Sequence, residues 1–146
     1  MKNVLGLVLL LSSSVTWAQT MSEQKLCAEQ GEKVFKGEVV THPTDQVGRG
    51  FTTHYNAKQH ACFVALKELD FFYSGTAESR SLFSILERIT IQNAFEGTLL
   101  GNYISNYEAE RKTTTVESCA LGKKDCENKV QFRAFAEQAG YGSIVE

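Results

Sequence analysis

The sequence predicts an α+β domain: an antiparallel sheet of about four or five strands, with one helix before it and one after it, braced by disulfides. Three observations support this prediction. Apolar residues recur at helical intervals near both ends of the chain, the stretches between them are rich in Thr, Val, Ile and aromatic residues, and there are four cysteines. In this fold class the helices cover one face of the sheet, and we expect that arrangement here.

The first 18 residues have the pattern of a secretory signal peptide. Lys2 gives a basic start, residues 4–11 are apolar apart from Gly6, and small residues lead up to Ala18. This apolar run is too short to cross roughly 30 Å of hydrocarbon, so a membrane anchor is the weaker alternative. We therefore expect residues 19–146 to form one compact exported domain, periplasmic or secreted, in a bacterium.

The charge balance of the expected mature chain argues against a nucleic-acid partner. Loss of Lys2 leaves 14 of the 15 basic residues against 17 acidic ones, a net charge of −3. A nucleic-acid surface needs a concentrated basic face, and Lys123 and Lys124 form only a lone basic pair. No segment after the signal peptide is long and apolar enough to span a membrane.

All four cysteines lie in the expected mature chain, at positions 27, 62, 119 and 126. An even number of cysteines in an exported chain predicts disulfides, and four allow three pairings. Zinc sites and redox motifs need close pairs such as C-x2-C, and no spacing here fits. We favour Cys119–Cys126 as a local closure and Cys27–Cys62 as a long-range crosslink.

The first helix is expected from about Ser22 to Lys36. Thr20 and Glu23 have the spacing of a capping box, and Gly37 stands where a helix would end. Cys27, Gly31, Val34 and Phe35 recur at helical intervals, which places the cysteine on the inward stripe.

A series of extended segments follows. Residues 38–50 contain the only proline and are expected to be a loop. The segment from Ala61 to Leu66 is apolar at every position, as in a central strand covered on both faces. The remaining expectations are a strand at 51–55, a turn at 56–59, an extended aromatic run at 69–75, an ambiguous helix or strand at 82–91, a turn at 93–97 with Gly97 at positive φ, and strands at 98–105 and 113–119.

A second helix is expected after residue 124, with Asp125 as its N-cap. Phe132, Phe135, Ala136 and Ala139 form one apolar stripe, and Gly140 follows it.

Candidate catalytic chemistry is sparse. If residues 54–64 form a hairpin, His54 and His60 come close across its turn and could share a proton or a metal. Two imidazoles without a third ligand make a poor metal site, so exposed polar residues beside a turn are the stronger interpretation. Glu96 is the most interesting carboxylate, because it lies beside Asn93 and a turn glycine, yet a structural role outweighs catalysis there. No nucleophile, zinc or phosphate-loop motif occurs, so we assign no catalytic residue, metal or cofactor.

Four short motifs occur in order along the chain: CAEQGEKVF at 27–35, THYNAKQHACFV at 53–64, NAFEGTLLGNY at 93–103, and a C-x6-C followed by FRAFAEQAGYG. In these motifs the chain resembles a group of small, exported, uncharacterised bacterial proteins. The resemblance implies export, disulfides and one compact domain. The chain departs from the pattern of this group at residues 74–88, and Asn93 stands where an aspartate would be expected. The resemblance implies no activity and no site residues.

The sequence therefore favours a non-enzymatic domain of the bacterial envelope that binds, inhibits or assists another macromolecule. Its candidate surface combines the 54–60 turn, the 93–97 turn and the aromatic run, with the following residues: His54, Tyr55, Asn56, His60, Phe72 and Glu96. Two alternatives stay open. One is a small hydrolase that uses His54 or His60 with a glutamate such as Glu96, and the other is a structural envelope component.

Overall fold

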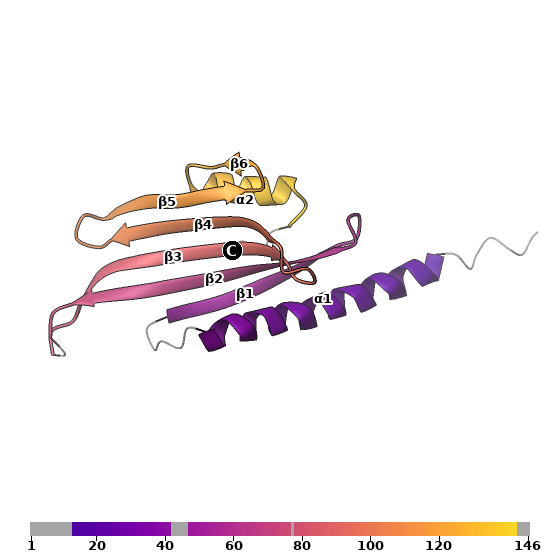
Figure 1. The fold of residues 1–146 in the computed structure, drawn as a ribbon, viewed down its shortest axis with the longest axis horizontal. Coiled ribbons are helices and arrows are strands. Elements are labelled where there is room, and N and C mark those ends of the chain that lie inside the picture. Colours follow the sequence, from indigo (N-terminus) through magenta and orange to yellow (C-terminus); the bar gives the residue numbers. More distant parts are fainter. Residues whose placement is uncertain (1–12, 42–46, 77, 143–146) are drawn as a thin grey trace, which may run out of the picture.

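The computed structural model describes residues 13–41, 47–76 and 78–142. The segment before Ser13, which carries most of the expected signal peptide, lies outside the described residues. Figure 1 shows one sheet with a long helix beside its first strands and a short helix near its last ones. The elements are α1 (Ser13–Thr41), β1 (Val47–Asn56), β2 (Ala61–Ser74), β3 (Ser81–Asn93), β4 (Leu99–Glu108), β5 (Thr113–Leu121), β6 (Lys124–Asp125) and α2 (Lys129–Gln138).

The sheet is an antiparallel meander in which every strand pairs with its neighbour in sequence, in the order β1-β2-β3-β4-β5-β6. The α+β class and the disulfide bracing are confirmed, but the sheet has six strands rather than four or five. The additional strand, β6, is only two residues long. The ambiguous 82–91 segment is part of strand β3, where Ile89 and Ile91 are buried.

The two helices cover opposite faces of the sheet, so the prediction that they share one face is wrong. Cys62 and Val64 of β2 pack in a core cluster with Cys27 of α1, whereas Phe63 and Ala65 pack in the larger cluster with Phe132 of α2. Neighbouring residues of a strand point to opposite faces. A run that is apolar at every position requires cover on both sides, and one layer of helices cannot supply it.

Helix α1 is attached to the sheet at three points along its inward stripe. Cys27 forms a disulfide with Cys62. Gly31 lies so close to β1 and β2 that a Cβ there would collide with Thr53 and touch Val64. Farther along, the ring of Phe35 stacks on Phe51 with 4.8 Å between centroids. Because Gly31 has no side chain, the helix backbone can approach the strands closely.

Helix α1 is longer than predicted at both ends. It runs through Gly37 to Thr41, and the predicted loop at 38–50 therefore begins too early. A Cβ at Gly37 would meet nothing within 4 Å, so this position faces open space. A glycine inside a helix costs about 1 kcal/mol relative to alanine, which the packing of the preceding turns can offset.

Helix α2 begins three residues later than a cap at Asp125 would allow. Asp125 lies in β6, and the N-cap is Asn128, whose Oδ1 accepts a hydrogen bond from the N–H of Gln131 at 3.0 Å. The predicted apolar stripe is confirmed: Phe132 and Ala136 are fully buried, and Phe135 and Ala139 pack beside them. The ring of Phe132 lies 5.9 Å from that of Tyr103 on β4.

Both disulfides have the predicted pairing, Cys27–Cys62 and Cys119–Cys126. The first joins α1 to β2, and the second joins β5 to the segment that leads into α2. Two disulfides are compatible with an oxidising, exported location. Within the described ranges, neither helix combines the length and the apolar character needed to span a bilayer.

Candidate functional site

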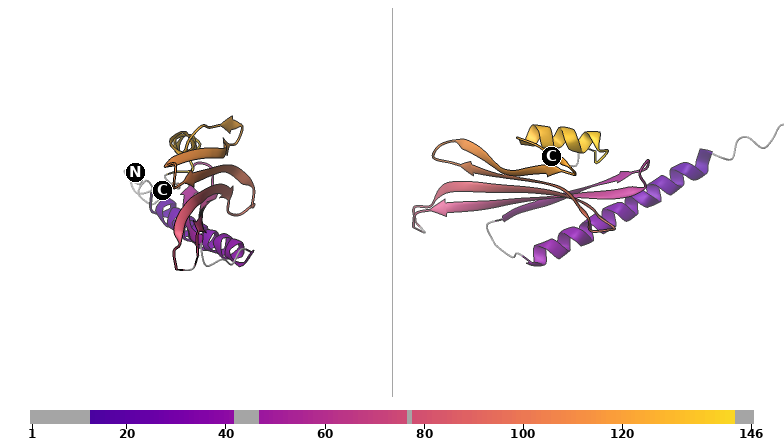
Figure 2. Two further views of the ribbon diagram at one scale, coloured as in Figure 1. Left: turned by 90° about the vertical axis from the view of Figure 1, so that its left-hand side faces the viewer. Right: turned by 45° about the horizontal axis from the view of Figure 1, so that its top comes forward.

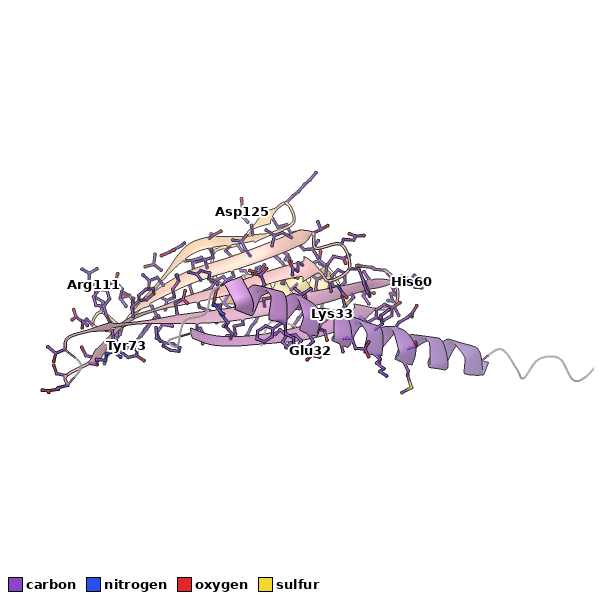
Figure 3. All side chains as sticks on the ribbon, turned by 60° about the horizontal axis from the view of Figure 1, so that its bottom comes forward. Glu32, Lys33, His60, Tyr73, Arg111 and Asp125 are labelled. Carbon is purple, nitrogen blue, oxygen red and sulfur yellow. A yellow bond between two sulfur atoms is a disulfide. The ribbon has the colours of Figure 1, made fainter. Side chains whose placement is uncertain are left out.

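The two ends of the sheet differ in how much of their surface is covered by other parts of the chain. Figure 3 places His60 at one end of the molecule, and Tyr73 and Arg111 at the other. The predicted surface therefore combines residues that lie at opposite ends of the sheet.

The β1–β2 turn is tied to the C-terminal end of α2. Asn56 Oδ1 accepts hydrogen bonds from the N–H groups of Lys58 and Gln59, which shapes the turn. Asn56 Nδ2 donates to the carbonyl oxygen of Gly140 at 2.7 Å, and Gln59 Nε2 donates to that of Ala139 at 3.1 Å. Ala139 is the C-cap of α2 and Gly140 follows it, so these two amides bind carbonyls just beyond the end of the helix. Asn56 therefore has a structural role.

The two histidines of this turn are directed away from each other. His54 pairs with Phe63 on the α2 side of the sheet, and its ring lies against Gly142. The phenol oxygen of Tyr55, on the α1 side, lies 3.4 Å from His60 Nδ1. Desolvation, and after it the nearby Glu23 carboxylate, raise the pKa of Tyr55 above its usual value.

Glu96 lies in a turn built by Asn93. Asn93 Oδ1 accepts hydrogen bonds from the N–H groups of Phe95 and Glu96, and Gly97 has the predicted positive φ, 67°. Ala94 is buried beneath α1, where its carbonyl oxygen accepts a hydrogen bond from Gln30 Nε2. The Asn93 side chain thus organises the turn, which leaves the Glu96 side chain exposed to solvent.

These side chains do not form one catalytic pocket. An open groove of about 640 Å³ is lined by His54 and Glu137, but neither His60 nor Glu96 lines it. The part of the chain that the structure describes contains no group of three or more His, Cys, Asp or Glu side chains able to hold a metal ion. The hydrolase alternative stays a prediction without support from this geometry.

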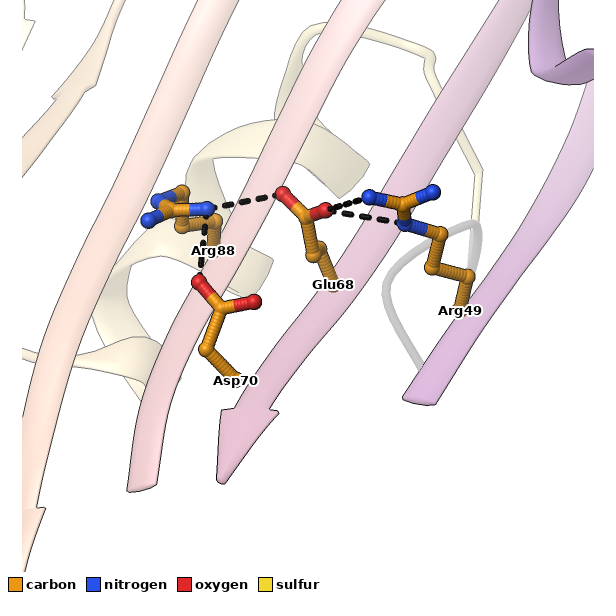
Figure 4. A network of polar contacts seen from close by, with 4 residues as sticks. All are labelled: Arg49, Glu68, Asp70 and Arg88. Atoms are coloured by element: carbon orange, nitrogen blue, oxygen red, sulfur yellow. Dashed lines mark hydrogen bonds and ion pairs between the residues drawn. The ribbon is translucent and has the colours of Figure 1, made fainter. Parts of the chain in front are cut away.

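A charged network that the sequence did not reveal lies halfway along β2 (Figure 4). Glu68 accepts hydrogen bonds from Arg49 Nε at 2.9 Å and from Arg88 Nη1 at 2.8 Å, and Arg88 also pairs with Asp70 at 2.9 Å. Burial raises the pKa of Glu68, but the two guanidinium groups outweigh it and hold the pKa below its usual value. A pocket of about 140 Å³ opens beside this network under Phe35 of α1.

The end of the sheet opposite the β1–β2 turn carries exposed aromatic side chains. Phe72, Tyr73 and Phe83 lie where the β2–β3 hairpin extends beyond the other strands, and they are 47, 47 and 51% exposed. We call these three residues the aromatic end. The guanidinium of Arg80 lies 5.9 Å from the centre of the Tyr73 ring. Exposed apolar side chains that cluster in this way often mark a site of interaction with a partner.

A row of apolar residues continues from the aromatic end onto the sheet. Phe71, Ile85 and Tyr107 are paired across β2, β3 and β4 and share the α2 side of the sheet. They are half-buried and belong to neither core cluster. Beside this row, Lys129 of α2 forms a 2.6 Å ion pair with Glu87 of β3, two residues from Ile85. Helix α2 thus covers one half of this face, and the described elements leave the other half open.

The sequence indicated the aromatic run at 69–75 but missed Phe83. Its segment fitted a helix and a strand equally well, so the face of Phe83 was undetermined. The segment is part of β3, and Phe83 lies at the irregularity between the pairs Phe72–Ser84 and Tyr73–Leu82.

The chain matches no family model, and neither the curated proteins nor the solved structures give a match. The resemblance to exported bacterial proteins stays a prediction.

Proposed function

We propose that this chain is a non-enzymatic binding domain of the bacterial envelope, and that its aromatic end contacts a partner protein. The observation that carries the proposal is the exposure of Phe72, Tyr73 and Phe83, three aromatic side chains close together at the end of the sheet that extends away from both helices (Figure 1). Aromatic residues provide much contact area at low entropic cost and dominate protein interfaces.

The charges around the aromatic end indicate the character of the partner. Arg80 lies over Tyr73, and Arg111 lies at the same end of the molecule. Arg111 is paired with Glu108 at 3.2 Å in an exposed ion pair, which contributes little and can be exchanged. The partner surface is expected to be apolar with acidic residues at its rim.

Site-specific photo-crosslinking tests the proposal. A benzophenone amino acid replaces Phe83 in the full chain, expressed in a bacterial host that exports it, and Val130 is replaced in a matched control. Val130 is 76% exposed on α2, so it reports non-specific contact of an apolar position that is more accessible than Phe83. We expect one adduct at position 83 that excess wild-type protein suppresses and excess Phe72→Ser/Phe83→Ser protein does not. Equal labelling at positions 83 and 130 would contradict the proposal.

A further inference from the structure

The first strand of the sheet has an open edge of unusual regularity. Strand β1 is the outermost strand, and all ten of its residues pair with β2 without a bulge. It contains neither proline nor lysine, and its single charged side chain, Arg49, is bonded to Glu68 within the sheet. Edge strands are normally protected by short length, bulges, prolines or outward lysines, because an open edge pairs with other strands. The described residues provide no strand for the outer side of β1.

A groove runs along this edge between β1 and α1. It has a volume of about 620 Å³, and Phe51, Thr52 and Thr53 form its strand side. Its helix side is a stripe of residues 25, 28, 29 and 32, which lie on one helix face because 25 is three and four residues from 28 and 29, and 32 is four and three residues from them. The disulfide at Cys27, within this span, and the ring stack of Phe35, just beyond it, fix the helix against the sheet.

We propose that a second copy of this chain occupies the groove, so that two β1 strands pair antiparallel near their C-terminal ends, around His54, across a two-fold axis and extend the sheet. The helix stripe is self-complementary under such an axis. Lys25 and Glu32 lie equally far from the midpoint of the stripe. With the axis at that midpoint, Lys25 of each copy faces Glu32 of the other. Ala28, near the midpoint, leaves room for close approach.

The spacing of strands and helices is compatible with this dimer. Gly31 approaches both Thr53 on β1 and Val64 on β2, so α1 lies above the line between these strands. Two neighbouring β1 strands about 4.8 Å apart would place the two helices about 10 Å apart, close to the usual packing distance of roughly 8–10 Å.

The charged residues of the stripe can change partners at small cost. Within one copy, Lys25 lies 3.9 Å from Glu29, and Glu32 lies 2.7 Å from Lys36. All four side chains are more than half exposed, and exposed pairs of this kind contribute little to stability. Two reciprocal pairs between copies would set the register of the dimer rather than provide most of its affinity.

Sedimentation velocity of the oxidised protein, purified after expression in a bacterial host, at concentrations up to about 1 mM, tests this proposal. We expect a concentration-dependent dimer. Lys25→Glu and Glu32→Lys should each weaken it about tenfold, and the double variant should restore most of the affinity. Lys33→Glu, on the same helix outside the stripe, is the control (Figure 3). Circular dichroism checks that each variant keeps its helices.

A second readout identifies the contact itself. Carbodiimide treatment of a mixture of ¹⁴N- and ¹⁵N-labelled protein should join Lys25 of one label to Glu32 of the other. A monomer at every concentration overturns the proposal. So does a dimer that Lys25→Glu and Lys33→Glu weaken equally, or a monomer that binds an extended peptide in the groove.

Discussion

Strand β2 passes through two environments. Its first half is buried on both faces: Cys62 and Val64 lie under α1, and Phe63 and Ala65 pack with the residues of α2. In its second half Phe72 and Tyr73 are about half exposed, although they are as apolar as the first half. Figure 2 shows the reason in space, since the helices lie by the same part of the sheet and the β2–β3 hairpin extends away from them. Similar composition thus supports folding at one end and is available for binding at the other.

The largest expected difference between the two halves concerns a buried and an exposed phenylalanine. Phe132→Ala removes a fully buried ring and should lower the free energy of unfolding by about 3–5 kcal/mol. Phe83→Ala, at a site 51% exposed, should change it by about 0.5 kcal/mol or less. Urea denaturation, monitored by far-UV circular dichroism, measures the free energy of unfolding of both variants. Equal losses for the two variants would contradict the division between the halves.

The second comparison concerns the disulfides, both of which brace the covered half. Cys27–Cys62 closes a separation of 35 residues and Cys119–Cys126 one of 7. In the chain-entropy model each disulfide contributes roughly 2–4 kcal/mol, with the longer loop at the upper end. Paired Cys→Ala variants, compared by urea denaturation, should show the larger loss for the 27–62 pair. A larger loss for the 119–126 pair would show that unfolded-state entropy is not the dominant cause.

A matched pair of glycines on α1 separates packing from helix propensity. Gly37→Ala places a methyl group in open space and should stabilise the protein by about 0.5–1 kcal/mol. Gly31→Ala carries the same propensity gain, but its methyl group would collide with Thr53 and should make the net change destabilising. Thermal unfolding of the two variants tests this, and stabilisation by both would show that α1 can move away from the strands.

Much of the covered half could be predicted because its signals are local. The uninterrupted apolar run from Ala61 to Leu66 identified a central strand, and the cysteine spacings favoured, among three possible pairings, the one that is observed. The same run also implies cover on both faces of the sheet. Placing one helix on each face would have required this implication to be applied to the helices. The predicted N-cap at Asp125 is wrong because Asp125 lies in the short strand β6, which forms through tertiary pairing with β5.

The length of β2 was missed for a different reason. Lys67, Glu68 and Asp70 interrupt its apolar pattern, and isolated charges of this kind normally indicate a strand end or a turn. The partners of Glu68 are Arg49 of β1 and Arg88 of β3, about 20 residues away in sequence in each case. Lys67 pairs with Glu87 of β3, 3.7 Å away. Cross-strand ion pairs make these charges compatible with a continuous strand, and a single sequence does not reveal such pairing.

The smallest expected effect concerns this network, which lies where β2 leaves the covered half. Because the pKa of Glu68 is lowered in the folded protein, its ionised form favours folding. That contribution is fully present above the unfolded pKa of about 4.5 and disappears as the pH falls through the lower folded pKa. Glu68→Gln should therefore be less stable than wild type near neutral pH, and the difference should shrink as the pH falls from about 5 towards 3.

Urea denaturation across that pH range measures the Glu68 difference, with Glu96→Gln as the control for loss of an exposed carboxylate. Amide hydrogen exchange then shows where the change acts. Because Arg49 and Arg88 hold Glu68 from both neighbouring strands, protonation should increase exchange in β2 from Glu68 onward before it affects Cys62 to Ala65. Uniform exchange along β2 would mean that the two halves unfold as one unit, and that the ion pairs stabilise the whole sheet rather than the junction between them.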